Sequence, residues 1–360
     1  MGGFHRPPHV TAPLTRPAPR PSAISYKPLD HGWLQWIAEN RLRECTPQSM
    51  QTTMVASGLD PAECAAAIAA MENDPAFLAA RKHQQLQRKL ESVLANLQQL
   101  WSSDPAYGRI EKRSGVSRDE FIERYVRGCR PVVLTDLARD WPAMQRWSPR
   151  DLKQRFGHLE VEIQTGRNND PNYEQNKLEL RSTQRLGDFV DTVVAGGPTN
   201  DYYMTANNEA LRRPEFAPLL ADIGTLPDFC DPSQLARLSS FWFGPAGTVT
   251  PLHHDTIMLL HTQIVGRKRW RFISPLETPR LYNHNGVFSP IDIDRPDLAR
   301  YPLFAQAQVL EVVVEPGETV FLPLAWWHQV TSLDVSLSFS FTNLALPNHY
   351  TYQNPSIHNW

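Results

Sequence analysis

This 360-residue chain has few cysteines, no long apolar run and almost no net charge, and each of these absences excludes a class of protein. Its four cysteines lie far apart and form no CxxC pair, which excludes a zinc ribbon and argues against a disulfide framework. No apolar stretch approaches the length that spans a bilayer. The chain has 36 Lys and Arg and 38 Asp and Glu, which gives a formal net charge of −2. This balance lacks the excess of positive charge that is typical of proteins that bind nucleic acid or a membrane surface.

These absences favour a reducing compartment. The first residues lack the apolar core of a secretory signal, and scattered cysteines fit the cytoplasm. We therefore expect a cytoplasmic protein without a membrane or nucleic-acid partner. Apolar residues make up 41% of the chain, which is enough to bury a sizeable core.

Composition and helix punctuation divide the chain into three predicted parts. Residues 1–30 contain seven prolines and little apolar periodicity, so we expect a disordered or extended lead-in. We expect an α-helical module over residues 31–104. The main domain is expected over residues 105–360 and begins in a polar segment. Three helix starts are predicted in the module, each by an N-cap residue followed by a proline: Thr46-Pro47, Asp60-Pro61 and Asp74-Pro75.

The last helix expected in the module covers about residues 75–101 and carries a repeated apolar stripe. Its apolar residues alternate in steps of four and three, which is coiled-coil spacing, at Leu86, Leu90, Val93, Leu97 and Leu100. The stripe has two interpretations: it packs on its own domain, or it forms a surface for a homodimer or a peptide partner.

The second half of the chain is rich in short β-strands. From residue 241 to residue 343, apolar segments alternate with turn residues, which is the pattern of a barrel or sandwich. Residues 336–342 alternate strictly, with Leu and Phe on one face and hydroxyl side chains on the other. Further strands are expected at residues 131–135, 159–164, 309–314 and 319–322, and a short helix at residues 149–156.

A candidate metal site lies in residues 250–255, which read TPLHHD. His253 and Asp255 are two residues apart, so on a β-strand they project from the same face. His328 is the best candidate for a third ligand that the fold brings in. Two histidines and one carboxylate form the facial triad of non-haem Fe(II) oxygenases.

Three segments together resemble a JmjC domain, and more narrowly the cupin-like hydroxylase branch that includes the asparaginyl hydroxylase acting on hypoxia-inducible factor. They are TPLHHD at 250–255, QIVGRKRW at 263–270, and the stretch from Pro316-Gly317-Glu318 to Trp326-Trp327-His328. The resemblance covers about residues 115–345. It implies a mainly β fold with flanking helices, built as a double-stranded β-helix (a cupin-like jelly-roll barrel). It also implies Fe(II), 2-oxoglutarate as cosubstrate, and O2.

The resemblance assigns the metal ligands to His253, Asp255 and His328, and the carboxylate of 2-oxoglutarate to Lys268. Many oxygenases of this superfamily instead use a basic residue about ten positions after the distal histidine, and here that position is Ser338. Strand alternation supports Lys268, because this lysine shares a face with Trp270 and Phe272. A lone lysine on an aromatic face is expected to be buried and paired.

Three more residues match positions that lie near the cosubstrate: Thr250, Tyr203 and Asn343. A packing role for Tyr203 and a strand-end role for Asn343 are the alternatives. Trp327 is expected to form a wall of the metal pocket. Leu259 departs from the related hydroxylases, which have asparagine there, and His254 and His261 are predicted to be non-catalytic because they lack ligand spacing.

The resemblance therefore implies a dioxygenase that hydroxylates an amino-acid side chain in a protein or peptide and decarboxylates 2-oxoglutarate to succinate. The alternatives are an oxygenase for a small molecule or an RNA base, a methyl-lysine demethylase, and an inactive cupin-like binding module. The related hydroxylases dimerise through C-terminal helices that this chain lacks, so a homodimer is expected to use the helix at residues 75–101.

Overall fold

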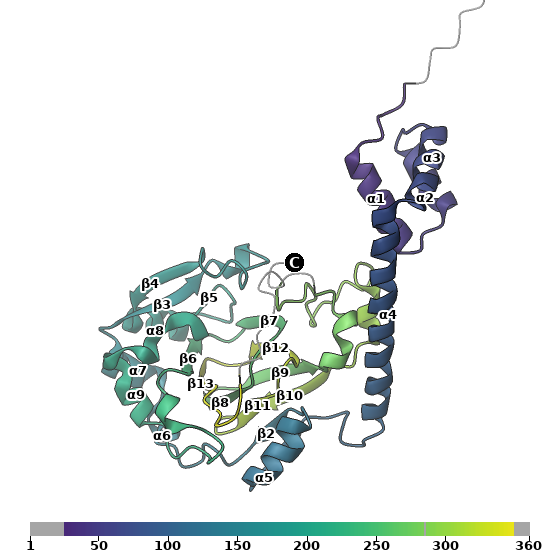
Figure 1. The fold of residues 1–360 in the computed structure, drawn as a ribbon. Helices are drawn as coiled ribbons and strands as arrows, with labels where there is room; N and C mark the ends of the chain where they lie inside the picture. The colour runs from purple at the N-terminus through teal and green to yellow at the C-terminus, as the bar shows by residue number, and fades with distance from the viewer. Residues whose placement is uncertain (1–24, 284–285, 349–360) are drawn as a thin grey trace, which may run out of the picture. The chain divides into compact units, whose positions relative to one another are not determined.

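The computed structural model describes residues 25–283 and 286–348 (Figure 1). The chain divides into two compact units, residues 1–90 and 91–360. The division lies inside one helix, α4 (Pro75–Ser102), which continues without a break to the end of the predicted module. The predicted lead-in lies outside the described residues up to residue 24. Near the C-terminal end of the predicted lead-in, Lys27 forms a β-bridge with Leu59, so this end is attached to the helical unit.

The first unit is helical, as predicted. Helices α1 (His31–Leu42), α2 (Pro47–Ala56) and α3 (Pro61–Met71) precede α4. The side chains of Thr46, Asp60 and Asp74 accept hydrogen bonds from backbone N–H groups in the first turns of α2, α3 and α4, so these expected caps are confirmed. A small core holds the unit together: Ile37, Met50, Met54, Leu59, Cys64 and Ile68.

The apolar stripe on α4 is exposed. All five of its residues, Leu86, Leu90, Val93, Leu97 and Leu100, leave at least 40% of their surface accessible. The interpretation that the stripe packs on its own domain is therefore wrong. The homodimer remains a prediction.

The second unit contains a jelly-roll barrel of eight strands, which confirms the expected fold class. The strands are β6 (Ser239–Gly244), β7 (Val249–His254), β8 (Leu259–Val265), β9 (Lys268–Ile273), β10 (Leu310–Val314), β11 (Thr319–Leu322), β12 (Trp327–Ser332) and β13 (Ser336–Phe341). One sheet begins with β1 (Glu111–Arg113) and β2 (Val132–Leu134) and has the order β1-β2-β11-β8-β13-β6, and the facing sheet has the order β10-β9-β12-β7. The eight strands thus pass back and forth between the two sheets.

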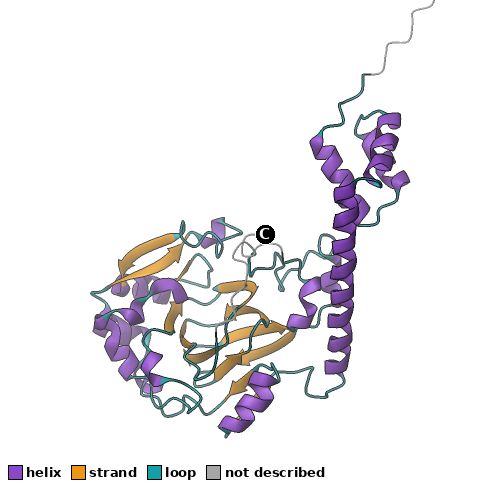
Figure 2. Ribbon diagram, viewed as in Figure 1, coloured by secondary structure: helices purple, strands orange, loops and turns teal. Residues whose placement is uncertain are grey.

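Additional elements surround the barrel. Strands β1 (Glu111–Arg113) and β2 (Val132–Leu134) extend the larger sheet, and β3 (Glu160–Thr165), β4 (Arg181–Arg185) and β5 (Tyr202–Tyr203) form a third sheet. The flanking helices are α5 (Arg118–Glu120) with its π-helical continuation Phe121–Arg127, α6 (Ala143–Arg146), α7 (Pro149–Phe156), α8 (Leu186–Ala195) and α9 (Ala217–Ala221). Figure 1 labels α6 to α9 on the side of the barrel where β6 and β13 lie, and Figure 2 shows the same helices in purple beside the orange strands. None of the described helices is both long and apolar enough to cross a membrane.

Strand β13 explains how the interior of the barrel becomes polar. Its Leu and Phe side chains join the large core on the helix side, where Phe339 contacts Trp141 and Trp147 edge-on. The alternate side chains, Ser338 and Ser340, are also buried but belong to the opposite face. The predicted hydroxyl face is therefore directed into the barrel and not toward bulk water.

Candidate functional site

His253, Asp255 and His328 lie together at one end of the barrel interior. His253 is on β7 and pairs directly with His328 on the antiparallel strand β12. The two imidazole ring centroids are 4.1 Å apart. The Nε2 atom of His253 is 4.0 Å from one Asp255 carboxylate oxygen, and the Nε2 atom of His328 is 3.9 Å from the other. We call these three residues the triad.

The hydrogen bonds of the two histidines leave the triad ready for a metal. The Nδ1–H of His253 donates to the Pro251 carbonyl at 2.8 Å, and that of His328 donates to the Trp326 carbonyl at 3.0 Å. Each Nε2 atom therefore has a free lone pair directed at the carboxylate.

The electrostatics of the triad agree with this chemistry. Burial holds the pKa of His328 well below its usual value, and nearby His253 adds to this effect, so His328 is neutral. Burial also raises the pKa of the Asp255 carboxyl, with partial opposition from His253. A bound divalent cation would remove the penalty for keeping this carboxylate charged, so the residues present fit a metal with imidazole and carboxylate ligands.

Lys268 lies on β9 and is almost completely buried. Its ammonium group donates to the Tyr203 hydroxyl at 3.1 Å and to the Ser338 hydroxyl at 2.9 Å. Ser338 occupies the position where many related oxygenases carry a basic residue. In this protein the ammonium group of Lys268 reaches the same position from β9, which belongs to the facing sheet. Burial lowers the pKa of Lys268 to about 7 because no anion is beside it.

A cavity of about 490 Å³ connects the triad to Lys268. Its walls include the triad, Lys268, Tyr203, Thr250, Trp242, His261, Trp270 and Val330. A register shift between His328 and Val330 pairs Thr250 with Val330, and this explains how Thr250 and His253 both reach the cavity despite their odd spacing on β7.

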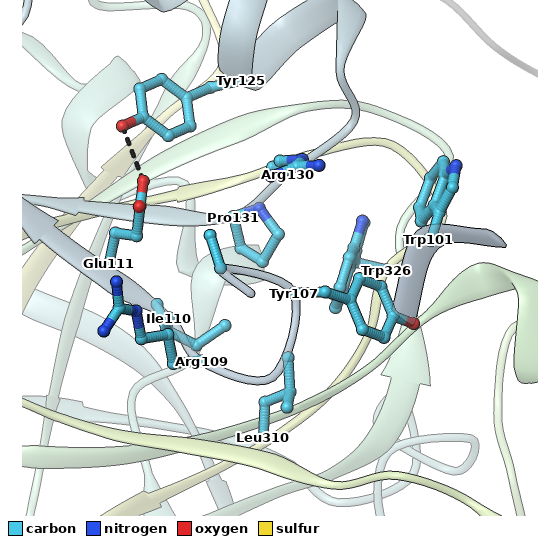
Figure 3. Close-up of a pocket in the computed structure, with 11 residues that line it drawn as sticks. Trp101, Tyr107, Arg109, Ile110, Glu111, Tyr125, Arg130, Pro131, Leu310 and Trp326 are labelled. Carbon is cyan, nitrogen blue, oxygen red and sulfur yellow. Dashed lines mark hydrogen bonds between the residues drawn. The ribbon is translucent and has the colours of Figure 1, made fainter. Parts of the chain in front are cut away.

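A second cavity of about 20 Å³, beside Trp101 and Tyr107, has room for only about one water molecule (Figure 3). The large cavity is therefore the candidate site.

Two expected residues do not line the large cavity. The side-chain amide of Asn343 donates to the Asp231 carbonyl at 2.8 Å, which fits the strand-end alternative. Trp327 was expected to form a wall of the metal pocket, and this is wrong. It packs on the outer face of the sheet against His254, and its indole N–H donates to Thr278, because neighbours on a strand project to opposite faces.

The cavity also contains residues that the sequence prediction missed. Trp242 and Ser340 line it, and so does His261, which was predicted only to be non-catalytic. Alternation was the available signal for His261, because it is two residues from Leu259 on β8 and must share its face.

The lowered pKa of Lys268 predicts a proton-linked binding reaction. At about pH 8 the ligand-free amine is mostly neutral, and a bound carboxylate raises its pKa, so binding of 2-oxoglutarate should take up close to one proton. At about pH 6 the amine is already charged and uptake should be near zero. Calorimetry of the Mn(II)-loaded protein in buffers of different ionisation enthalpy measures this uptake. Lys268→Arg is the control, because a guanidinium does not titrate in this range; equal uptake at both pH values would contradict the prediction.

The barrel and the triad define a cupin-like domain of the JmjC kind. Residues 117–348 match the family model described as the cupin-like domain, so the chain belongs to this family. The expected cofactors, Fe(II), 2-oxoglutarate and O2, are those that this family and this donor set support.

Curated relatives fall within the same family. The chain is 32% identical over 233 residues to lysine-specific demethylase 8 of Xenopus tropicalis, covering 62% of this chain and 50% of that protein. It is 33% identical over 272 residues to lysine-specific demethylase JMJ30 of Arabidopsis thaliana, covering 70% and 60%. It is 31% identical over 222 residues to HSPB1-associated protein 1 of Homo sapiens, covering 57% and 45%. The chain therefore spans about half the length of the relatives that it matches.

Proposed function

We propose that this protein is an Fe(II)- and 2-oxoglutarate-dependent dioxygenase that hydroxylates an amino-acid side chain in a protein or peptide. The observation that carries the proposal is the shared cavity, which has the triad at one end and the buried cation Lys268 at the other. A molecule with a metal-chelating keto acid and a distant carboxylate matches both ends. An inactive binding module has no need to keep a buried lysine in this position.

The chain's residues have distinct tasks in this proposal. His253, Asp255 and His328 hold the iron, which when bound supplies the oxidative chemistry with O2 and 2-oxoglutarate. Lys268 binds the far carboxylate, and its hydrogen bonds to Tyr203 and Ser338 fix the direction of the ammonium group. Tyr203 stays protonated, because burial raises the pKa of its hydroxyl.

The walls of the cavity protect the reacting atoms. The Trp270 ring stacks against the His328 ring with a centroid distance of 5.7 Å. Val330, which follows His328 on β12, also lines the cavity. These apolar groups exclude water and limit side reactions. No side-chain general base is needed for the proposed reaction.

The outer part of the cavity is cationic. Lys177, Arg212 and Arg237 line it, and of these only Arg212 has a carboxylate partner within the described ranges. The two carboxylates that line the cavity are Asp255 and Glu174, and Glu174 accepts from buried Arg167. Residues 1–24, 284–285 and 349–360 contain no Asp or Glu. This balance favours an acidic or neutral polypeptide over a cationic methylammonium group.

Demethylation of methyl-lysine is the second candidate, because the names of two of the relatives state this activity. Both reactions begin with hydroxylation of a carbon, so the same site chemistry serves either. The substrate charge distinguishes them. The third candidate is an oxygenase that acts on a small molecule or an RNA base. The part of the cavity proposed to bind the cosubstrate would serve a small substrate as well as a polymer.

A peptide assay separates these candidates. The purified protein, supplied with Fe(II), 2-oxoglutarate and O2, should add one oxygen atom to members of an acidic peptide library, as read by mass spectrometry. A basic library containing trimethyl-lysine should give little reaction. Arg237→Glu should lower turnover of the acidic peptides, whereas Arg139→Glu, in the α5–α6 region outside the cavity, serves as the matched charge control. Loss of methyl groups with release of formaldehyde would instead establish demethylation.

A further inference from the structure

His261 occupies a central place in the cavity wall. It lies on β8 between the partner residues Val320 on β11 and Ser340 on β13, and only 4% of its surface is accessible. Its ring centroid is 5.0 Å from that of Trp270 and 5.8 Å from that of Trp242. These two indoles hold the imidazole in one orientation, so its position is built into the barrel.

The Nε2 atom of His261 is buried and has no hydrogen-bond partner among the described residues. Two other polar groups of the wall are satisfied: the Trp242 indole N–H donates to Ser340 at 2.8 Å, and Lys268 has two hydroxyl partners. The Trp270 indole nitrogen and the Ser239 hydroxyl, which also belong to this wall, are buried without a partner among the described residues. A buried polar atom without a partner costs free energy, so the unpaired atoms indicate that the occupant of the cavity is polar.

His261 lies between the two ends of the cavity. Trp242, one of the two indoles beside its ring, also has the Lys268 ammonium over its face at 5.5 Å. Trp270, the second indole beside His261, stacks against the triad residue His328. Burial, Lys268 and His328 together hold the pKa of His261 well below its usual value, so the imidazole is neutral and has one N–H to donate.

The same strand explains why a donor is needed here. Leu259, two residues before His261, shares its face and lines the cavity without any polar atom. A carboxylate that enters this region therefore finds no partner at the Leu259 side chain and a buried, unpaired nitrogen at His261.

We propose that His261 is a binding residue for 2-oxoglutarate, donating a hydrogen bond from Nε2 to a carboxylate of the cosubstrate as it lies between Lys268 and the triad. This inference rests on the proposed function. It gives the cosubstrate a neutral donor in addition to the lysine, and it makes His261 a determinant of affinity for the keto acid.

The test compares His261→Phe with His261→Gln in the Mn(II)-loaded protein. Phenylalanine keeps a ring beside the two indoles but removes the donor, whereas glutamine restores an N–H. Calorimetry should show about tenfold weaker 2-oxoglutarate binding for His261→Phe and recovery of most of this loss for His261→Gln. Mn(II) affinity and melting temperature are measured for each variant and should remain close to the wild-type values.

The outcomes separate this inference from the function on which it rests. Wild-type protein that binds Mn(II) but not 2-oxoglutarate overturns the proposed function and the inference together. Wild-type protein that binds 2-oxoglutarate no more tightly than folded His261→Phe overturns the inference alone. Equal losses in His261→Phe and His261→Gln, with Mn(II) affinity retained, also contradict it, because the ring and not the donor would then be responsible.

Discussion

Replacing Asp255 with alanine should abolish the visible charge-transfer absorption that appears when 2-oxoglutarate is added to the Fe(II)-loaded protein without oxygen. Loss of a hydrogen-bonding partner of a metal ligand typically weakens metal binding by about 10- to 100-fold, and loss of a ligand itself should exceed this. The carboxylate is also the only anionic member of the triad, so its removal leaves only two imidazoles to hold the metal. Turnover of any substrate should fall below detection.

An anaerobic titration measures this effect directly. His253→Ala should behave like Asp255→Ala, whereas His158→Ala removes an exposed histidine far from the triad in sequence and should leave the band unchanged. If Asp255→Ala showed the full absorption band, the assignment of the metal centre to this site would be wrong. Absence of a band in the wild-type protein would remove the basis of the oxygenase proposal and would favour the binding-module alternative.

Replacing Lys268 with methionine should weaken 2-oxoglutarate binding while leaving the metal in place. Removing one partner of a buried charged pair costs about 2–5 kcal/mol, which corresponds to a Kd at least about 30-fold higher. The triad does not include Lys268, so Mn(II) affinity should stay close to the wild-type value. This separation of metal binding from cosubstrate binding distinguishes a specific loss from general misfolding.

The same substitution should raise the melting temperature of the ligand-free protein. Burial lowers the pKa of Lys268 from 10.5 to about 7, so the unfolded chain binds more protons than the folded chain between these values. The native lysine therefore opposes folding increasingly as the pH falls toward 7, and methionine of similar length removes this penalty.

The control for Lys268 is Arg267→Met, which removes an exposed cation that pairs with Asp334. It should change neither the Kd for 2-oxoglutarate nor the metal affinity. If Lys268→Met bound the cosubstrate as tightly as the wild-type protein, the carboxylate would have another partner, and the assignment of the cavity's far end would be wrong.

The sequence predicted those features that depend on neighbours along the chain. The helix N-caps at Thr46 and Asp60 follow from the preference of a short polar side chain before a proline, and both were found. The face shared by Lys268, Trp270 and Phe272 follows from strand alternation, and all three are buried. Alternation should also have placed Trp327 on the face opposite to His328.

Contacts between strands distant in the chain could not be read in this way. The partnership of Lys268 with Ser338 depends on the distance between two facing sheets, and the accessibility of Thr250 depends on a register shift between β7 and β12. Asn343 lies close to the end of β13 but is held by Asp231, a residue from a different part of the chain. Each of these depends on long-range pairing, which local spacing does not constrain.

The jelly-roll form was implied by the resemblance to the JmjC domain. By itself, the sequence pattern determined that residues 241–343 form the short strands of a barrel or sandwich, that His253 and Asp255 share a strand face, and that a lone lysine stands on an aromatic face. These properties depend on periods of two residues and on short turns, which are local. Only the tertiary structure decided that the triad and Lys268 open into one cavity and that His261 lies between them with an unpaired nitrogen. The physical reason is that a cavity belongs to no single strand: its shape is set by how two sheets pack and in which register their strands pair.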